Sequence, residues 1–138
     1  PEIARALHQA IKSRLVEACH DCSEGGWAVA SAEMAIAGEL GLDLDLGAVP
    51  GCSNLADDAT CCFSESNGRY LVEVKPENAA AFESVMSQLS ATMIGEVTME
   101  QRLLVKGLKG AVVINAPVVD LEWAWRTIHP AGGDIRDA

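Results

Sequence analysis

The sequence has few basic residues and few aromatic ones. Its 138 residues include 10 Lys and Arg against 20 Asp and Glu, for a formal net charge of −10, and aromatic residues make up 4%. Attraction to a phosphate backbone or an anionic lipid surface needs a basic face, so nucleic-acid and membrane partners are disfavoured. An anionic ligand therefore has to be held locally, by backbone N–H groups or by a metal ion.

The sequence also lacks long apolar runs and a regular cysteine framework. No run reaches the roughly 18 apolar residues of a transmembrane helix. The cysteines are odd in number and two are adjacent: Cys19, Cys22, Cys52, Cys61 and Cys62. This pattern favours buried free thiols in a reducing compartment over a set of disulfides, so we expect a cytoplasmic protein.

Length and composition are those of one globular domain. Apolar residues make up 49% and charged residues 22%, and one domain is the expectation for a chain below ~150 residues. We place this domain at residues 1–128, followed by a frayed, Gly- and charge-rich tail at 129–138. The chain starts at Pro1, and no signal-peptide pattern follows this residue. This start indicates a piece of a longer or processed protein.

Hydrophobic periodicity predicts helices interspersed with strands. Helices are expected over 2–17, 27–37, 76–89 and 118–127. Strands are expected over 42–46, 61–64, 69–74, 93–98, 102–106 and 111–114, with a short strand at 17–20. The Asn67-Gly68 pair predicts a hairpin turn between 61–64 and 69–74. This order indicates an α+β layered domain in which a mixed, mostly antiparallel sheet packs with helices.

The stretch best suited to chemistry precedes the alanine-rich helix. It reads His20-Asp21-Cys22-Ser23-Glu24-Gly25-Gly26. Ser23 fits the N-cap position, which puts Gly25 and Gly26 in the first turn and leaves backbone N–H groups bare at the positive end of the helix dipole. Such a helix start suits a phosphate. The alternative is an ordinary capped helix whose glycines permit close packing.

Three side chains of this stretch have open roles. Glu24 would repel a bare phosphate, so either it points away or Mg²⁺ lies between the two. His20 either acts as a base or donates to a phosphate, or it orders the turn through Asp21. Asp21 is expected to be structural, accepting hydrogen bonds from N–H groups of the turn.

Several ordered motifs carry a family resemblance. They are the stretch at 20–26, the alanine-rich segment 28–35, and the segments 63–74, 94–97 and 121–125. Together they resemble the C-terminal domain of phosphoribosylformylglycinamidine synthase (formylglycinamide ribonucleotide amidotransferase, PurL type). Its superfamily also includes the synthetases of aminoimidazole ribonucleotide and selenophosphate, thiamine-monophosphate kinase and the hydrogenase maturation protein HypE. The segment Ser64 to Tyr70 favours the amidotransferase among these.

The resemblance implies a domain of a purine-biosynthesis ligase with the fold of an aminoimidazole ribonucleotide synthetase C-terminal domain. In that enzyme ATP activates the amide oxygen of formylglycinamide ribonucleotide, and glutamine-derived ammonia displaces the phosphate. ATP and Mg²⁺ would be bound mainly by N-terminal domains, which also carry the catalytic histidine. No catalytic residue and no metal ligand are therefore expected in this chain, and alone it should be inactive.

The resemblance also implies site residues and partners. The phosphate of the ribonucleotide is expected at His20, Asp21, Ser23, Glu24, Gly25 and Gly26, with Ser66 and Asn67 lining the cleft. The expected partners are the N-terminal domains of the same enzyme, a glutaminase and small accessory subunits. The face that those domains would cover is expected to be apolar, so the isolated chain could form a homodimer.

Other readings of the same residues remain. The chain could instead be a standalone binding or interaction module. Cys19, His20 and Cys22 could join the distant cysteines in a zinc site, although their spacing is unlike a Cys-x-x-Cys knuckle. Arg69 is expected to pair with Glu73 or Glu65 at the surface rather than to bind a ligand.

Two tryptophans of the last predicted helix cannot share one face. Trp123 and Trp125 are two residues apart, and side chains at that spacing diverge on a helix. One is expected in the core and the other on the surface or at an interface.

Overall fold

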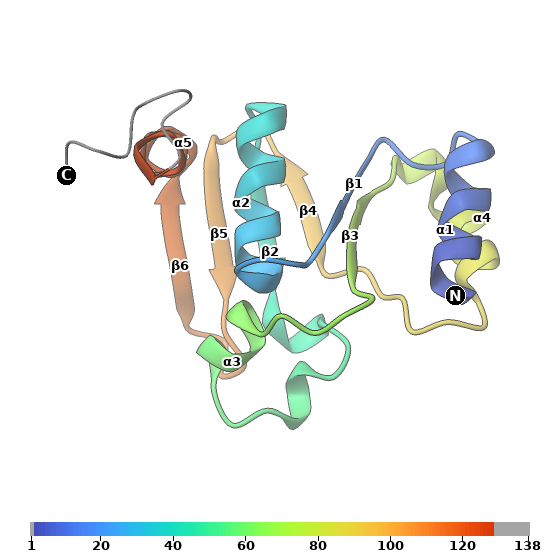
Figure 1. The fold of residues 1–138 in the computed structure, drawn as a ribbon, viewed down its shortest axis with the longest axis horizontal. Coiled ribbons are helices and arrows are strands. Elements are labelled where there is room, and N and C mark those ends of the chain that lie inside the picture. The colour runs from blue at the N-terminus through green and yellow to red at the C-terminus, as the bar shows by residue number, and fades with distance from the viewer. Residues whose placement is uncertain (1, 129–138) are drawn as a thin grey trace, which may run out of the picture.

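The computed structural model describes residues 2–128, so the predicted tail at 129–138 lies outside the described residues. Figure 1 traces the fold. The α-helices are α1 (Glu2–Lys12), α2 (Gly26–Gly38), α3 (Asp58–Phe63), α4 (Ala79–Met86) and α5 (Val118–Ile128). The strands are β1 (Ala18–Asp21), β2 (Gly41–Asp45), β3 (Tyr70–Glu73), β4 (Gly95–Thr98), β5 (Arg102–Lys106) and β6 (Val112–Pro117). Three 3₁₀ turns are η1 (Leu46–Ala48), η2 (Cys52–Asn54) and η3 (Pro76–Asn78).

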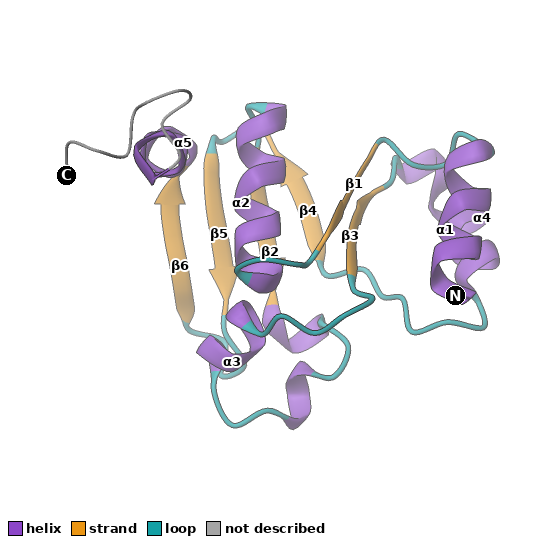
Figure 2. Ribbon diagram, in the orientation of Figure 1, coloured by secondary structure: helices purple, strands orange, loops and turns teal. Residues whose placement is uncertain are grey.

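The strands form two sheets (Figure 2). The larger has the order β4-β2-β5-β6, in which β2 and β5 are parallel and the other neighbours antiparallel. The smaller is the antiparallel pair β1 and β3. The predicted α+β class with a mixed, mostly antiparallel sheet is confirmed.

Helix α2 packs against the larger sheet and forms the main core. Leu42 and Leu44 of β2 stand in register with Leu103 and Val105 of β5, and all four side chains are buried. Small residues on α2 let its backbone approach this surface, and Ser31 on the same helix is fully buried. The alanine-rich helix predicted over 27–37 is confirmed as α2.

A second, smaller core joins α1 to α4 at the far end of the β1–β3 pair (Figure 1). Leu7 and Ala10 of α1 pack with Met86 of α4, and Phe82 and Leu89 are partly buried around them. The helix predicted over 76–89 is present as η3 followed by α4, which ends at Met86. Helix α1 ends at Lys12 rather than at 17, because Arg14 takes a left-handed φ of 57° and turns the chain.

The predicted hairpin between 61–64 and 69–74 is wrong. Residues 58–63 form the short helix α3, whose start is capped by the Asp57 side chain accepting from the Thr60 N–H at 2.8 Å. Strand β3 pairs instead with β1, with Ala18 opposite Glu73. The predicted short strand at 17–20 is thus confirmed as the partner of β3. A capped helical turn competes with a strand over so few residues, and tertiary contacts decide between them.

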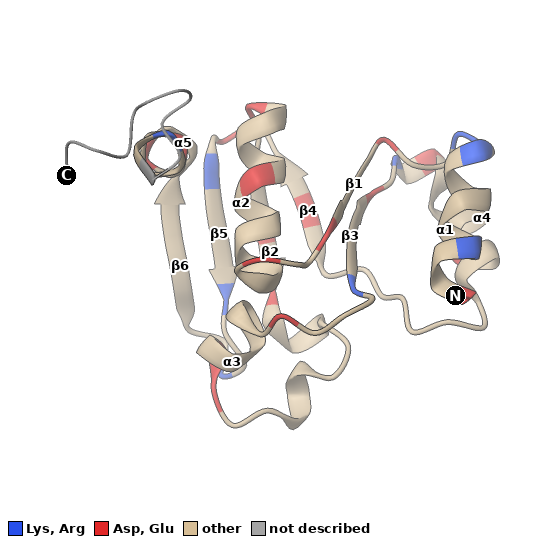
Figure 3. Ribbon diagram, in the orientation of Figure 1, with Lys and Arg blue, Asp and Glu red and all other residues tan. Residues whose placement is uncertain are grey.

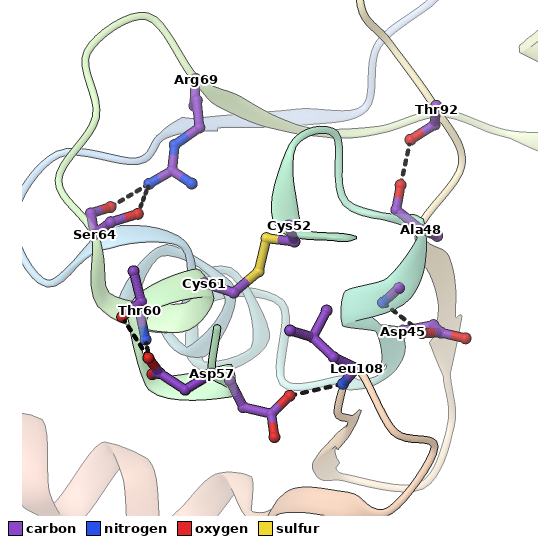
Figure 4. The surroundings of a disulfide bond; sticks show 12 residues. Asp45, Ala48, Cys52, Asp57, Thr60, Cys61, Ser64, Arg69, Thr92 and Leu108 are labelled. Carbon is purple, nitrogen blue, oxygen red and sulfur yellow. Dashed lines mark hydrogen bonds between the residues drawn. A yellow bond between two sulfur atoms is a disulfide. The ribbon is translucent and has the colours of Figure 1, made fainter. Parts of the chain in front are cut away.

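The expectation of free thiols throughout is also wrong. Cys52 and Cys61 form a disulfide with a Cα–Cα distance of 5.4 Å, inside the usual range (Figure 4). Cys22 and Cys62 are buried free thiols, as predicted, and Cys19 is free and exposed. The fold brings Cys52 of η2 beside Cys61 of α3, a proximity that an odd number of cysteines does not reveal.

Within residues 2–128, no helix combines the length and the apolar character needed to cross a membrane.

Candidate functional site at the start of helix α2

Two glycines form the start of α2. Gly25 is the N-cap residue with a left-handed φ of 70°, and Gly26 begins the helix with φ 67°. Gly25 has no side chain that could cap the helix, and the Ser23 backbone carbonyl accepts a hydrogen bond from the Gly26 N–H at 3.2 Å. The prediction that Ser23 is the N-cap is therefore wrong: the chain turns two residues later because glycine tolerates the left-handed conformation.

The N–H of Gly25 is bound by a carboxylate from a distant loop. It donates to Oε1 of Glu65 at 2.9 Å, and Glu65 follows α3 in the chain. The positive end of a helix favours a negative charge, so this contact has a clear electrostatic cause. From the sequence, Glu65 is expected only as a partner for Arg69. No local pattern indicates that the loop carrying Glu65 crosses the start of α2.

The glycines are also needed for packing. A Cβ on Gly26 would lie 2.8 Å from the Phe63 carbonyl carbon and from the Ser64 carbonyl oxygen. A Cβ on Gly25 would lie 2.3 Å from Cγ2 of Val29. Close packing, the alternative role of these glycines, therefore applies here, and the Gly25 N–H is occupied by the Glu65 carboxylate.

His20 links three elements of the fold. Its Nδ1 lies 2.7 Å from the Asp21 carbonyl oxygen, and its Nε2 lies 3.1 Å from Oε2 of Glu33 on α2. Oε1 of Glu33 accepts a hydrogen bond from Nε1 of Trp125 on α5 at 3.2 Å. The contacts of the imidazole ring therefore support an ordering role, joining β1 to α2. The Asp21 carboxylate is exposed, with Oδ1 3.9 Å from Nδ1 of His20.

The remaining predicted residues lie on the two loops that meet here. Ser23 and Glu24 are exposed on the β1–α2 connection, and Ser66 and Asn67 are exposed beyond Glu65. Figure 3 shows acidic positions on both connections. The structure thus brings the 23–26 stretch beside the 64–67 loop, in surroundings that are mainly acidic.

Arg69 does not make the predicted surface ion pair. Its Nη2 donates to the backbone carbonyl of Ser64 and to the Ser64 hydroxyl, the latter at 3.2 Å. Its Nε and the indole Nε1 of Trp27 are buried donors with no hydrogen-bond partner among residues 2–128. Arg69 therefore braces the loop that carries Glu65.

The three free thiols are weak nucleophiles. Burial is the main factor that raises the pKa of Cys22 and of Cys62, with the Asp58 carboxylate adding to the effect at Cys62. Burial also raises the pKa of Cys19, with Asp21 contributing. Over residues 2–128, no three His, Cys, Asp or Glu side chains are grouped so that they could hold a metal ion.

The comparison with protein families decides the classification. Residues 1–107 match the model described as AIR synthase related protein, C-terminal domain. The chain belongs to this family. The matched segment runs through β5, so it includes the start of α2 and the loop that carries Glu65.

Curated relatives of this AIR synthase C-terminal domain are much longer proteins. Phosphoribosylformylglycinamidine synthase subunit PurL of Lactobacillus helveticus is 39% identical over 124 residues, which cover 90% of this chain and 15% of that protein. The same subunit of Limosilactobacillus reuteri is 40% identical over 121 residues, covering 87% of this chain and 15% of the relative. The chain thus spans about 15% of the relatives that it matches.

Solved structures share the fold. Thermotoga maritima PurL complexed with ATP superposes with a TM-score of 0.78 at 25% identity, covering 87% of this chain and 21% of that one. The complex of the same protein with FGAR gives 0.77 at 24% identity, with 87% and 20% covered. Escherichia coli HypE, a hydrogenase maturation protein, gives 0.66 at 21% identity, with 81% and 38% covered.

Proposed function

We propose that this chain is the C-terminal domain of a phosphoribosylformylglycinamidine synthase. The whole enzyme would convert formylglycinamide ribonucleotide, ATP and glutamine-derived ammonia to formylglycinamidine ribonucleotide. The observation that carries the proposal is the identity of about 40% to PurL subunits over most of the chain. The higher TM-score to PurL, 0.78 against 0.66 for HypE, favours this enzyme over a hydrogenase maturation protein.

In this proposal the domain forms one wall of the ribonucleotide site. The phosphate binds at the start of α2, where the Gly25 N–H already holds an anionic group, the Glu65 carboxylate. The backbone N–H groups at 23–25 contact the phosphate while the Gly26 N–H stays bonded to the Ser23 carbonyl, and Ser66 and Asn67 line the same opening. Because the surroundings are acidic, binding requires that Glu65 withdraw or that a cation screen Glu24 and Glu65.

The chemistry takes place elsewhere in the enzyme. We assign ATP and Mg²⁺ mainly to the N-terminal domains, as the resemblance to the family implies. ATP supplies the leaving phosphate that activates the amide oxygen. This domain contributes by positioning the substrate and by stabilising its phosphate, and alone it is inactive.

The chain covers about 15% of the length of its relatives, so we expect part of its surface to contact other domains of the enzyme. Helix α5 exposes Val119 at 67% and Trp123 at 70%, one turn apart on the same face. We assign this face to contacts with other domains of the enzyme, or with a second copy in the isolated chain. A solved structure of T. maritima PurLQS supports a complex with a glutaminase and a small accessory subunit. We place this complex in the cytoplasm, as the reduced thiols suggest.

Ligand-induced stabilisation tests the phosphate role. Inorganic phosphate, formylglycinamide ribonucleotide and ATP with Mg²⁺ are titrated at low salt into this chain, and in parallel into the longer enzyme. A ligand present at one hundred times its Kd raises the free energy of unfolding by about 2.7 kcal/mol. We expect phosphate or the ribonucleotide to stabilise at least the longer enzyme.

Matched variants locate the effect. Gly25→Asp is unsuitable because any Cβ there meets Val29. Ser23→Asp places a negative charge on an exposed residue beside the Gly25 N–H, and Ser90→Asp adds the same charge at an exposed position after α4. Loss of ribonucleotide affinity in Ser23→Asp but not in Ser90→Asp supports the site. Equal affinities in both variants would place the phosphate elsewhere. If the longer enzyme forms no amidine, the proposed function itself is rejected.

A further inference from the structure

The disulfide joins η2 to α3, and the end of α3 leads to the start of α2. Cys52 lies in η2 and Cys61 in the last turn of α3, nine residues apart in sequence. Figure 4 shows the bond surrounded by hydrogen bonds of the neighbouring loops. One of these is donated by the Thr92 hydroxyl to the Ala48 carbonyl at 2.8 Å. Both cysteines are almost fully buried, at 2% and 0% exposure.

Few other interactions hold the segment between the two cysteines. Residues 53–57 are all exposed. Helix α3 has six residues, too few for stability without tertiary support. Its polar supports are the Asp57 cap and the Asp58 carboxylate, which accepts a hydrogen bond from the Leu108 N–H at 2.6 Å, and its two buried cysteines pack in the main core. The disulfide is the covalent tether between η2 and α3.

The end of α3 leads directly into the site. The Ser64 N–H donates to the Thr60 carbonyl at 3.1 Å, and the next residue, Glu65, binds the Gly25 N–H. The backbone of 62–64 also lies against Gly26 so closely that a Cβ would clash. A change in the position of α3 must therefore move the carboxylate at the start of α2.

We propose that Cys52 and Cys61 form a reversible redox site whose state sets how firmly the 64–65 segment is held at the start of α2. In the oxidised chain α3 is tethered and Glu65 stays on Gly25. In the reduced chain α3 loosens and the carboxylate leaves the N–H more often. The inference goes beyond the proposed function and does not rest on it, since it concerns the order of this segment with or without a ligand.

The reaction balances with a small disulfide as oxidant. One protein thiolate attacks a low-molecular-weight disulfide such as glutathione disulfide, forming a mixed disulfide and releasing one small thiol. The second protein thiolate then displaces the other small thiol and closes the Cys52–Cys61 bond. Two electrons pass from the protein thiols to the small disulfide, and the two thiol protons leave with its products. Opening of the exposed 53–57 segment gives the reagent access without disturbing the larger sheet.

Redox titration tests whether the bond forms reversibly. The chain is equilibrated in glutathione buffers of increasing oxidised fraction, quenched and alkylated, and its free thiols are counted by intact mass and peptide mapping. We expect five alkylated cysteines in reducing buffer and three in oxidising buffer, with Cys52 and Cys61 as the protected pair. Pairing of Cys61 with any cysteine other than Cys52, pairing of Cys62 with any cysteine, or no change across the buffers would overturn the proposal.

Amide hydrogen exchange by NMR tests the structural consequence. We expect the Gly25 and Ser64 amides to exchange at least tenfold faster in the reduced chain, while the β5 amides keep their rates. Cys52→Ser should match the reduced chain in every buffer, and Cys62→Ser, the adjacent thiol, should keep the redox response. Equal rates at Gly25 in both states would overturn the proposal. Faster exchange in β5 as well would do the same, because the bond would then stabilise the whole fold rather than this segment.

Discussion

Gly25 and Glu65 lie 40 residues apart in the chain and are joined by a hydrogen bond of 2.9 Å from the glycine N–H to the glutamate Oε1. The bond connects the start of α2 to the loop after α3. It places a carboxylate where we propose the substrate phosphate, so the two anions compete for the same N–H group. This competition can be tested by removing the charge of Glu65.

Replacing Glu65 by Gln should strengthen phosphate binding. The variant removes a charge that repels phosphate at the helix start, so we expect a several-fold lower Kd, measured by calorimetry at low salt. Without ligand, the loss of the favourable charge–dipole interaction should lower the free energy of unfolding by about 0.3–1 kcal/mol.

The control for this variant is Glu83→Gln, which removes the same charge from an exposed position on α4. It should leave the phosphate Kd almost unchanged. If both variants strengthen binding equally, the effect comes from net charge, and Glu65 does not compete at a local site.

Replacing Gly26 by Ala should destabilise the fold more than replacing Gly110. Both glycines have positive φ, 67° and 78°, so each alanine incurs the left-handed penalty of about 1–2 kcal/mol. The Gly110 position is open, whereas at Gly26 the Cβ meets backbone atoms of 62–64. Overpacking against backbone should add about 1–3 kcal/mol, visible as a lower midpoint in urea unfolding. Equal midpoints would show that α3 moves freely away from α2.

The stability of the chain should decline in alkaline solution because of the buried thiols. Burial raises the pKa of Cys22 and Cys62 above the ordinary value of 9.0. The folded state therefore holds these protons more tightly than the unfolded state, and the free energy of unfolding falls as the pH rises above 9.

The double variant Cys22→Ala/Cys62→Ala isolates this effect from other alkaline titrations. Urea unfolding at about pH 7 and about pH 10.5 should show a larger loss of stability for the parent than for the variant. Identical losses would mean that the two thiols are as accessible in the folded chain as in the unfolded one.

Replacing Trp123 by Glu should reduce self-association of the isolated chain. The side chain is 70% exposed on α5 beside Val119, and exposed apolar faces promote association. Sedimentation velocity at increasing concentration should show dimers for the parent and fewer for the variant. Ser90→Glu, which adds the same single charge at an exposed position after α4, serves as the control for acidic charge. A parent that stays monomeric would reject the homodimer.

The burial of Trp123 and Trp125 could not be predicted from the sequence. The spacing of Trp123 and Trp125 excluded a shared face, and the two side chains do diverge. The prediction that one lies in the core is wrong, since they are 70% and 43% exposed. Helical spacing gives direction only, whereas burial depends on which neighbour covers the face. Trp125 instead reaches Glu33 and thereby joins α5 to α2.

The sequence by itself determined the class of fold and the family. Hydrophobic periodicity is a local pattern, so the expected strand 42–46 and the expected helices 27–37 and 76–89 predicted β2, α2 and α4 from neighbouring residues alone. The ordered motifs pointed to the amidotransferase family, and the match over residues 1–107 together with the PurL relatives bears this out.

Only the tertiary structure decided how the start of α2 is built. Residues 58–63 became a helix, β3 paired with β1, Cys52 met Cys61, and Glu65 rather than the Ser23 side chain reached the helix start. Each of these contacts joins residues that are distant in sequence or settles a choice between two local conformations of similar energy. Such choices depend on what the whole chain buries, which no local pattern records.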